Sequence, residues 1–434
     1  MNPSLAAIPA LTVVCVLALI LTGCTGPGEP GPSALEITPA PSTSMTIRAI
    51  PGSVMNVVDA NNRFALTLYA RLADEPAYRN DNLFFSPFSI SSALAITCEG
   101  ARGTTAEEIR AVFHFPEDQN VLRSGFAEVI ASMNSKKNAY TLQTANALWA
   151  EQTYPFLPDY ISTADRYYSA KTTNLDFVHH PEESRNTINQ WVEDQTLDRI
   201  KDLIPQGEIN ANTALVITNA IYFKGNWVKQ FDPAQTREAD FLTGDGSLVR
   251  VPMMQRTDDA AIFRYTETDS FQVLEMPYES GNGTELSMLI ILPVGNDVEG
   301  ITRSLDIRTL QEIRQSLAFK LVRVYVPKFT METKYFLART LSAMGMPTAF
   351  TPGADFSGMD GSRDLFITNV IHQAFVEVNE EGTEAAAATA VIMGKGVAMV
   401  DDVPVFRADH PFIFFIQEKE TGNILFMGRV SDPV

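Results

Sequence analysis

The sequence predicts an α+β fold with large antiparallel sheets. Helical and strand patterns are mixed along the chain without the strict alternation that a parallel βαβ fold shows. Apolar segments joined by short turns, at Ser280–Gly283 and at Thr421–Asn423, indicate antiparallel hairpins. The apolar run Thr213–Phe223 is typical of a strand buried on both faces. A chain of 434 residues with 45% hydrophobic residues can build an ample core.

The overall charge argues against a nucleic-acid partner. The chain has 33 Lys and Arg residues against 52 Asp and Glu residues, which gives a net charge of -19. No basic stripe is present that could displace counterions from phosphates. We therefore expect no binding to nucleic acid.

The N-terminus has the pattern of an export signal. The apolar run Leu5–Leu21 is short for a membrane span, so residues 1–23 are better explained as a signal peptide. Leu21–Cys24, Leu-Thr-Gly-Cys, resembles the lipobox of prokaryotic lipoproteins and implies a lipidated Cys24. However, no Lys or Arg precedes the run. An uncleaved anchor or ordinary signal cleavage are the alternatives.

A linker follows the signal. Residues 24–50 are rich in Pro, Gly, Ser and Thr, which suits a semi-extended tether. We expect a single folded domain over residues 51–434. The protein is then secreted or exposed at the cell surface, and lipidated Cys24 would attach it to the membrane of the cell envelope.

The first part of the domain shows a helix, a strand and two further helices. Asn56–Leu72 has amphipathic spacing, and Leu83–Phe85 fits a short buried strand. The Ser86-Pro87 junction starts a helix that ends at Gly100. A capping box for the next helix is expected from one of two pairs, Thr104 with Glu107 or Thr105 with Glu108.

The rest of the domain alternates between strand-like and helical segments. Further helices are expected at Asp159–Tyr168, at Asn186–Ile204, which carries Trp191, and at Leu337–Met344, which ends at Gly345. Strands are expected, besides Thr213–Phe223, at Tyr140–Ala150, Val249–Met254, Ala260–Tyr265, Gln272–Pro277, Leu286–Leu292, Leu321–Phe329 and Ile367–Val378.

The sequence shows no enzyme or metal motif. The three cysteines supply no disulfide framework, and the five histidines lack ligand spacing, so we expect no metal and no cofactor. Neither a nucleophile elbow nor a phosphate-binding glycine loop occurs. Ser86 could be offered as a nucleophile, but a helix-cap serine explains it better. We therefore expect that the protein is not an enzyme.

The stretch from Asn379 to Val403 fits no ordinary element. Ala385–Ala388 favour helix, whereas the residues from Thr389 to Met393 favour strand. Read with period two, the face that begins with Thr383 carries no charge and could enter a sheet interior, while Glu384 lies on the other face. A flexible surface loop rich in Ala and Gly is the alternative.

Several ordered motifs across the chain resemble the serpin family, from about Val54 to Val434. They are NLFFSPFSISSALA at 82–95, TNAIYFKGNW at 218–227, VPMM at 251–254, HQAFVEVNEEGTEAAAATA at 372–390, DHPFIFFI at 409–416 and GNILFMGRV at 422–430. The resemblance implies three β-sheets, about eight or nine helices and an exposed reactive-centre loop in the Ala-rich stretch.

The resemblance also implies a function. Inhibitory serpins are suicide inhibitors: the target protease cleaves the loop, forms an acyl-enzyme, and is trapped when the loop inserts into the main sheet. The partner would be a serine endopeptidase, with cysteine endopeptidases as a second class, and we expect the inhibitor to be a monomer. A non-inhibitory serpin that acts as a binding or carrier protein is the alternative.

The resemblance assigns roles to individual residues. The hinge comprises Glu380, Glu381, Gly382, Thr383 and Ala385, Ala386, Ala387 and Ala388, and Gly382 would supply an unusual φ. The shutter, where the central strands part, maps onto Ser86, Ser89, Asn219 and His372. Trp191 matches the breach tryptophan beneath the point where insertion starts.

The cleaved bond stays open between alternatives. Counting from Glu380 puts the cut between Gly396 and Val397, whereas counting back from Pro411 moves it towards Val400. Cleavage after Lys395 would imply trypsin-like targets, and cleavage after Gly396, Val397 or Ala398 would imply enzymes that accept small side chains. Cleavage after Met399 would imply chymotrypsin-like or subtilisin-like enzymes. We favour the bond from Gly396 to Val397, with Lys395 next.

Overall fold

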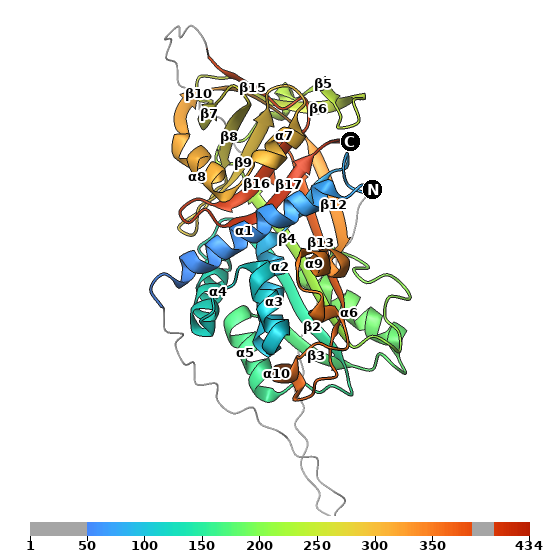
Figure 1. Ribbon diagram of the computed structural model, residues 1–434. Coiled ribbons are helices and arrows are strands. Elements are labelled where there is room, and N and C mark those ends of the chain that lie inside the picture. The colour runs from blue at the N-terminus through green and yellow to red at the C-terminus, as the bar shows by residue number, and fades with distance from the viewer. Residues whose placement is uncertain (1–49, 384–402) are drawn as a thin grey trace, which may run out of the picture. The chain divides into compact units, whose positions relative to one another are not determined.

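The computed structural model describes residues 50–383 and 403–434. This part of the chain contains three sheets and ten α-helices (Figure 1). The helices are α1 (Ser53–Asp74), α2 (Pro87–Gly100), α3 (Gly103–Phe113), α4 (Gln119–Met133), α5 (Pro158–Tyr168), α6 (Pro181–Gln195), α7 (Val298–Ser304), α8 (Ile307–Ser316), α9 (Ala338–Met344) and α10 (Ser357–Asp360), with short 3-10 turns η1 (Pro233–Gln235) and η2 (Thr348–Phe350).

The three sheets confirm the α+β class. The seven-stranded sheet has the order β1 (Leu83–Phe85), β17 (Ile424–Val430), β16 (Phe412–Glu418), β9 (Leu286–Pro293), β8 (Phe271–Pro277), β7 (Ile262–Glu267) and β10 (Ala318–Leu321). The four-stranded sheet has the order β15 (Val405–Arg407), β11 (Arg323–Pro327), β6 (Leu248–Arg256) and β5 (Arg237–Leu242). The six-stranded sheet has the order β12 (Phe329–Phe336), β13 (Ile367–Val378), β14 (Gly382–Thr383), β4 (Leu215–Asn226), β2 (Thr141–Glu151) and β3 (Lys171–Leu175).

Both predicted hairpins form as antiparallel pairs. β8 pairs with β9 across the Ser280–Gly283 turn, and β16 pairs with β17 across the second turn. The C-terminal hairpin lies inside the seven-stranded sheet, because β16 also pairs with β9 and β17 also pairs with β1. Strands from both ends of the domain therefore share one sheet.

Helix starts follow the predictions at α2 but not at α3. The Ser86 hydroxyl caps α2 by accepting a hydrogen bond from the Ser89 N–H at 3.1 Å. The predicted capping box at α3 is wrong, because Arg102 is the N-cap residue and its side chain makes no capping hydrogen bond. The candidate side chains have distant partners instead: Glu108 accepts from the N–H of Thr348, and Thr105 accepts from the N–H of Asp355. Tertiary contacts here replace a local cap.

The single strand expected at Leu321–Phe329 is wrong. This segment contributes to three strands, β10, β11 and β12, which belong to the three different sheets. The hydrogen-bond partner changes at two points: the Val322 N–H donates to the Ala261 carbonyl, and the Lys328 N–H donates to the Pro252 carbonyl. An apolar run predicts extended backbone, but it carries no signal for a change of sheet.

The helix expected at Asn186–Ile204 is too long. α6 ends at Gln195, and the following segment contains Leu197, Asp198 and Asp202 with φ of 54°, 60° and 47°. Left-handed backbone at non-glycine residues ends a helix. The segment still buries apolar side chains at helix-like spacing, such as Ile200 and Ile204, and this explains why the pattern resembles a continued helix.

The six-stranded sheet separates two layers of apolar side chains. On β4, Ile217 packs into the main core with α1 to α5, whereas its neighbour Val216 packs into a second cluster with α6. On β13, Val370 and Ile371 divide in the same way. The strands are buried on both faces, as continuous apolar runs predict.

Candidate functional site

A seam between β13 and β4 lies at the centre of the six-stranded sheet. The two strands pair in parallel, with Ile367 opposite Leu215 at one end and Phe375 opposite Tyr222 at the other. Beyond Phe375 the strands no longer pair with each other, and β14 lies between them. β14 is antiparallel to both neighbours, because Thr383 pairs with Val378 of β13 and with Gly225 of β4. The chain thus reverses direction after β13 and enters the seam beyond the pair of Phe375 and Tyr222. We call this end the upper end of the seam.

The turn that leads into β14 is held by backbone hydrogen bonds from the segment after β4. The Trp227 N–H donates to the Glu381 carbonyl at 2.8 Å, and the Phe231 N–H donates to the Glu380 carbonyl at 2.8 Å. The Trp227 indole N–H donates to the Asn379 carbonyl at 3.1 Å. Three donors from one short segment therefore fix the position of the turn.

The Glu380 carboxylate forms a partly buried ion pair. It accepts from Lys328 Nζ at 2.9 Å and from the Thr236 hydroxyl at 2.7 Å. Burial alone would raise the pKa of Glu380, but the hydrogen bonds from Lys328 and Thr236 lower it, and the pKa lies below its usual value. The carboxylate is thus held ionised, and it ties the turn to the start of β12.

Gly382 is required by close packing rather than by its φ. It does not have a positive φ, so the expectation of an unusual backbone angle is wrong. A Cβ at this position would lie 2.1 Å from the Gly225 carbonyl oxygen and 2.7 Å from Asn226 Cα. These are backbone atoms that cannot move aside cheaply, so only glycine allows β14 to approach β4 this closely.

Thr383 points into the protein. Its side chain is fully buried, and its hydroxyl lies 2.8 Å from the Tyr278 hydroxyl. Tyr278 in turn stacks on Trp227, with ring centroids 4.4 Å apart. Since side chains alternate along a strand, the residue at 383 marks the inward face of β14.

Trp191 does not lie beneath this turn, and its assignment to the breach is wrong. It belongs to α6 and packs edge-on against Trp149, with centroids 5.4 Å apart. Trp149 pairs with Val216, which lies at the opposite end of β4 from Asn226. The tryptophan that contacts the turn is Trp227. The sequence could have indicated Trp227, because it ends the motif TNAIYFKGNW directly after a buried strand.

A polar row crosses the sheet under the seam. His372 of β13 lies opposite Asn219 of β4, which lies opposite Asn146 of β2. The structure brings all four predicted shutter residues together here: Ser89 Oγ accepts from Asn219 Nδ2 at 2.5 Å, and the Ser86 N–H donates to His372 Nε2 at 3.0 Å. Asn146 completes the network through hydrogen bonds from Asn219 and Ser89. Sequence reasoning missed it, although it shares the period-two face of buried Leu142 and Leu148.

The contacts of His372 determine its protonation state. Nε2 accepts from the Ser86 N–H, so Nδ1 carries the hydrogen and donates to Asn219 Oδ1. Protonation of Nε2 would set two hydrogens against each other. Burial lowers the pKa of His372 to about 3, so the imidazole stays neutral in the folded protein.

Comparison with known proteins identifies the family. The family model described as serpin (serine protease inhibitor) matches residues 59–433. The chain belongs to the serpin family. It is 40% identical to a serpin-like protein of Methanosarcina mazei over 98% of each chain, and 42% identical to the leukocyte elastase inhibitor of Bos taurus over 86% of this chain and 98% of that one.

A solved serpin structure shows the same fold. The crystal structure of human thyroxine-binding globulin is similar with a TM-score of 0.79 and 30% identity, covering 88% of this chain and all of that one. Relatives named as protease inhibitors and a neighbour named for a small ligand thus share this serpin architecture.

Several predicted residues lie outside the described part of this serpin. They are the signal peptide 1–23, Cys24, almost all of the linker 24–50, Ala385–Ala388, Lys395, Gly396 and Val397. Within the described part, Glu380 to Thr383 come together with Trp227, Tyr278 and Lys328. No local signal could have indicated Lys328, because its contact with Glu380 depends on two strands that are distant in sequence.

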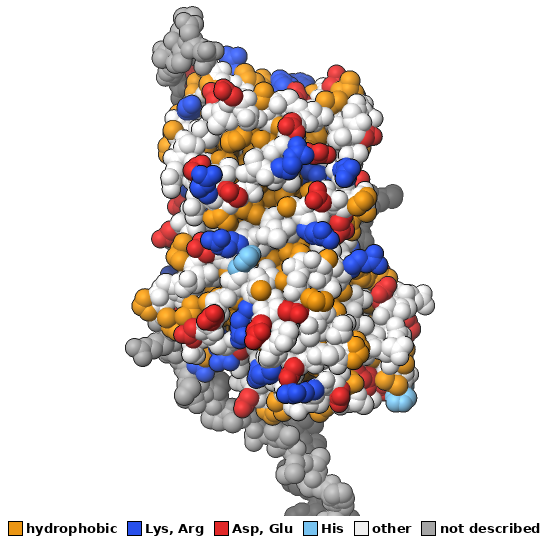
Figure 2. All heavy atoms as spheres, in the orientation of Figure 1, with side chains coloured by type: hydrophobic (Ala, Val, Ile, Leu, Met, Phe, Trp, Pro, Cys, Tyr) orange, Lys and Arg blue, Asp and Glu red, His pale blue; other side chains and the backbone are white. Residues whose placement is uncertain are grey.

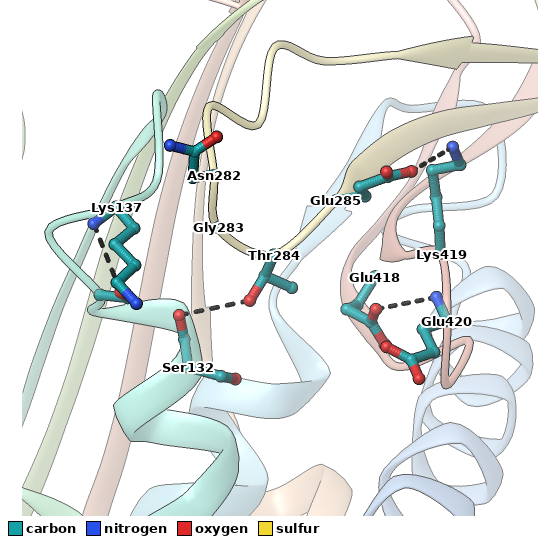
Figure 3. A pocket seen from close by; sticks show the side chains of 10 residues that line it. Ser132, Lys137, Asn282, Gly283, Thr284, Glu285, Glu418, Lys419 and Glu420 are labelled. Carbon is teal, nitrogen blue, oxygen red and sulfur yellow. Dashed lines mark hydrogen bonds and ion pairs between the residues drawn. The ribbon is translucent and has the colours of Figure 1, made fainter.

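A pocket lined by charged and polar side chains lies between the β8–β9 turn, the end of α4 and the β16–β17 turn (Figure 3). Three of its charged side chains have partners within it: Lys419 pairs with Glu285 at 2.6 Å, and the Glu418 carboxylate accepts from the Glu420 N–H. Within residues 50–383 and 403–434, no group of three or more His, Cys, Asp or Glu could hold a metal ion, and no helix is long and apolar enough to cross a membrane.

Ser86 is not arranged as a nucleophile. Its hydroxyl donates to the Leu425 carbonyl at 2.6 Å and is completely buried. The His372 ring contacts the Ser86 N–H instead of the hydroxyl. The general base that a nucleophilic serine needs is therefore missing from this contact.

We predict that the neutral His372 makes stability depend on pH. A folded-state pKa below the unfolded value of about 6.5 means that the unfolded chain takes up the proton first. Stability is then fully present above pH 6.5 and falls as the pH drops towards 3, by about 1.4 kcal/mol per pH unit. Urea unfolding midpoints between pH 7.5 and pH 5 measure this. The variant His372→Gln keeps a donor and an acceptor but cannot titrate, so equal pH slopes in both proteins would contradict the assignment.

We predict that Lys328→Met loosens the turn before β14. The variant leaves the Glu380 carboxylate partly buried without its cation, so the N–H groups of Trp227 and Phe231 should exchange up to about fivefold faster, which is equivalent to about 1 kcal/mol. Hydrogen exchange with mass spectrometry measures both amides. Lys201→Met removes an exposed lysine elsewhere and is the control. Unchanged exchange in Lys328→Met would show that the ion pair does not hold the turn.

Proposed function

We propose that this serpin is a suicide inhibitor of serine endopeptidases, with cysteine endopeptidases as a second target class. The observation that carries the proposal is the position of β14, which already lies between β13 and β4 at the upper end of the parallel seam. A strand that continued downward from β14 would lie antiparallel to both neighbours. The sheet is thus arranged to accept one more strand from the residues after Thr383.

Insertion releases free energy because it adds hydrogen bonds. One parallel pairing would be replaced by two antiparallel pairings, which are slightly more stable per residue. About a dozen new ladder bonds at roughly 1 kcal/mol each supply on the order of 10 kcal/mol. Ala385–Ala388 present small side chains that do not obstruct entry. In this proposal, insertion of the whole loop requires that its tether at one end be cut.

Cleavage removes the tether at one end. The nucleophile of the protease attacks the scissile carbonyl, an ester or thioester bond forms, and the peptide bond breaks to release a new amino terminus. The loop then inserts and carries the acylated protease along. Distortion of the active site of the protease prevents hydrolysis of the acyl bond, so each inhibitor molecule is consumed once. A trap of this kind is not an enzyme.

The polar row provides a reversible closure of the seam in this proposal. His372 and Asn219 face each other across β13 and β4, so an entering strand must separate them. Their buried hydrogen bonds would otherwise be lost at considerable cost. Ser86, Ser89 and Asn146 offer alternative partners once the strands part. This arrangement favours two defined states over a gradual opening.

A non-inhibitory binding or carrier protein is the second candidate. The observation in its favour is the similarity to thyroxine-binding globulin, whose name describes ligand binding. The two functions differ in outcome. A carrier is cleaved by proteases without forming a covalent complex, whereas an inhibitor forms one in proportion to the protease added.

The cellular location is proposed from the N-terminal sequence. The signal-like residues 1–23 support secretion or display at the cell surface, and Cys24 supports attachment to the envelope through a lipid. A monomer suffices for the mechanism, because the loop and the receiving sheet belong to one chain. Lys, Arg, Asp and Glu are interspersed on the face shown in Figure 2, with no basic stripe for nucleic acid there.

The decisive experiment mixes the protein with a panel of serine and cysteine endopeptidases. We expect at least one protease to form an adduct that survives denaturing gel electrophoresis. Mass spectrometry should show a released C-terminal fragment that begins between Gly396 and Asp401, with Val397 as the favoured start. Clean cleavage by the whole panel without any adduct would refute the inhibitor and favour the carrier.

A pair of variants tests the inward face of the loop. With Thr383 buried, alternation places Ala385 and Ala387 inward and Ala386 outward on an inserted strand. Ala387→Arg should block insertion and convert the inhibitor into a substrate, while Ala386→Arg should retain trapping. Thr383→Arg should also abolish trapping, but this change disturbs the contact with Tyr278 before any cleavage. The measurement is the number of inhibitor molecules consumed per protease inactivated. Equal trapping by both alanine variants would contradict the assignment of faces.

A further inference from the structure

The four-stranded sheet carries a small basic surface next to the end of the reactive stretch. Arg323 of β11 lies opposite Val405 of β15, and Tyr325 lies opposite Arg407. Residues two apart on a strand share a face, so these four side chains form one block on one side of the sheet. We call this block the Arg-Tyr surface. β15 is the edge strand of the sheet and begins at Val405, three residues after the end of the undescribed range 384–402.

The Arg-Tyr surface is accessible and partly preorganised. Arg323 is exposed, and the Val405 side chain is 43% exposed. The Arg407 guanidinium stacks on the Tyr325 ring, with Cζ 3.8 Å from the ring centroid. Stacking fixes the plane of the guanidinium, and within residues 50–383 and 403–434 its N–H groups form no hydrogen bond or ion pair that would compete with a bound carboxylate. Arginine and tyrosine are also the residue types that dominate binding energy at protein interfaces.

The two guanidinium groups carry unbalanced positive charge in the described part of the chain. Neither forms an ion pair within residues 50–383 and 403–434; Asp409, two residues after Arg407, pairs with His410 at 2.9 Å. Arg250 of the same sheet, in contrast, pairs with Asp240 at 3.1 Å. The whole chain has a net charge of -19, so this surface has the opposite sign to the protein that carries it.

The Arg-Tyr surface lies within reach of a protease engaged with the loop. Pro404, whose carbonyl accepts from the Arg323 N–H at 2.9 Å, follows Gly396 by eight residues. Eight residues span at most about 28 Å when fully extended. A protease domain of roughly 230 residues has a radius of gyration of about 17 Å. Its surface beside the active-site cleft therefore comes within reach of β15 whichever of the candidate bonds is cut.

We propose that the Arg-Tyr surface is a docking site for the target protease, and that it binds a carboxylate-rich surface beside the active-site cleft of that protease. The inference rests on the proposed inhibitory function and adds how the target is selected. An acidic protease would otherwise be repelled by the net charge of the inhibitor. Two guanidinium groups near the loop make the local electrostatic potential positive, and they orient the protease as it approaches.

The test measures the association rate constant of the double variant Arg323→Ala/Arg407→Ala with a protease that forms the adduct. At low ionic strength we expect a fall of roughly tenfold, which shrinks towards nothing at 0.5 M salt. The stoichiometry and the mass of the adduct should not change, because the loop and the seam are intact. Arg323→Glu/Arg407→Glu should lower the rate further.

A matched control removes two other exposed charges. Arg250 and Arg303 both pair with carboxylates, Asp240 and Glu299, and Arg250→Ala/Arg303→Ala changes the net charge equally. This control should keep the wild-type rate. If both double variants slow association equally, net charge explains the effect and the docking site is refuted.

The remaining outcomes are distinct. An unchanged rate and salt dependence in the Arg323 and Arg407 variants would overturn the docking site while leaving the inhibitory function intact. A loss of adduct at every salt concentration would show that the two arginines support the loop itself, which also overturns it. If no protease forms an adduct even with the wild-type chain, the proposed function fails, and the docking inference fails with it.

Discussion

The parallel pairing of β13 with β4 is the constraint around which the rest of the structure is arranged. The helix α2 lies under the seam and supplies Ser86 and Ser89 to its polar row, while α6 covers the opposite face of the same sheet with a separate apolar cluster. The turn at Glu380 to Gly382 is anchored at the upper end of the seam by backbone and ion-pair contacts. Opening the seam therefore engages both layers of the molecule at once.

The seam also explains why a row of polar residues lies inside an otherwise apolar sheet. A sheet buried on both faces is normally apolar throughout. Here His372, Asn219 and Asn146 lie in one row across three adjacent strands and satisfy one another. Such a row gives the strands a defined register, because a slip of one residue would leave several buried polar groups without partners. An apolar row would tolerate such a slip more easily.

Sequence patterns predicted much of the fold because the strands are strongly apolar and the turns have clear signals. β1, β13 and the C-terminal hairpin form where the patterns place them. The patterns predict no element where α4, α7, α8, β3 and β5 form. The helix α8 was missed although its buried residues Leu310 and Ile313 have helical spacing. They also fail at some places where a long-range contact replaces a local signal. Glu108 accepts a hydrogen bond from the Thr348 N–H instead of capping the start of α3. The extended segment after Leu321 passes through three different sheets. Trp191 lies in a predicted helix and Trp227 comes shortly after a predicted strand. Only the three-dimensional arrangement shows which of the two contacts the turn before β14.

The central position of the C-terminal hairpin has a consequence for how the chain is made. β16 and β17 lie between β9 and β1, so the seven-stranded sheet stays incomplete until residues 412–430 have left the ribosome. Leu83 pairs with Arg429, so β1 cannot join the sheet before β17 has been synthesised. Pairings of such long sequence separation slow folding. A chain that is exported before this hairpin closes would cross the membrane unfolded. Its seven-stranded sheet would then be completed only on the far side of the membrane.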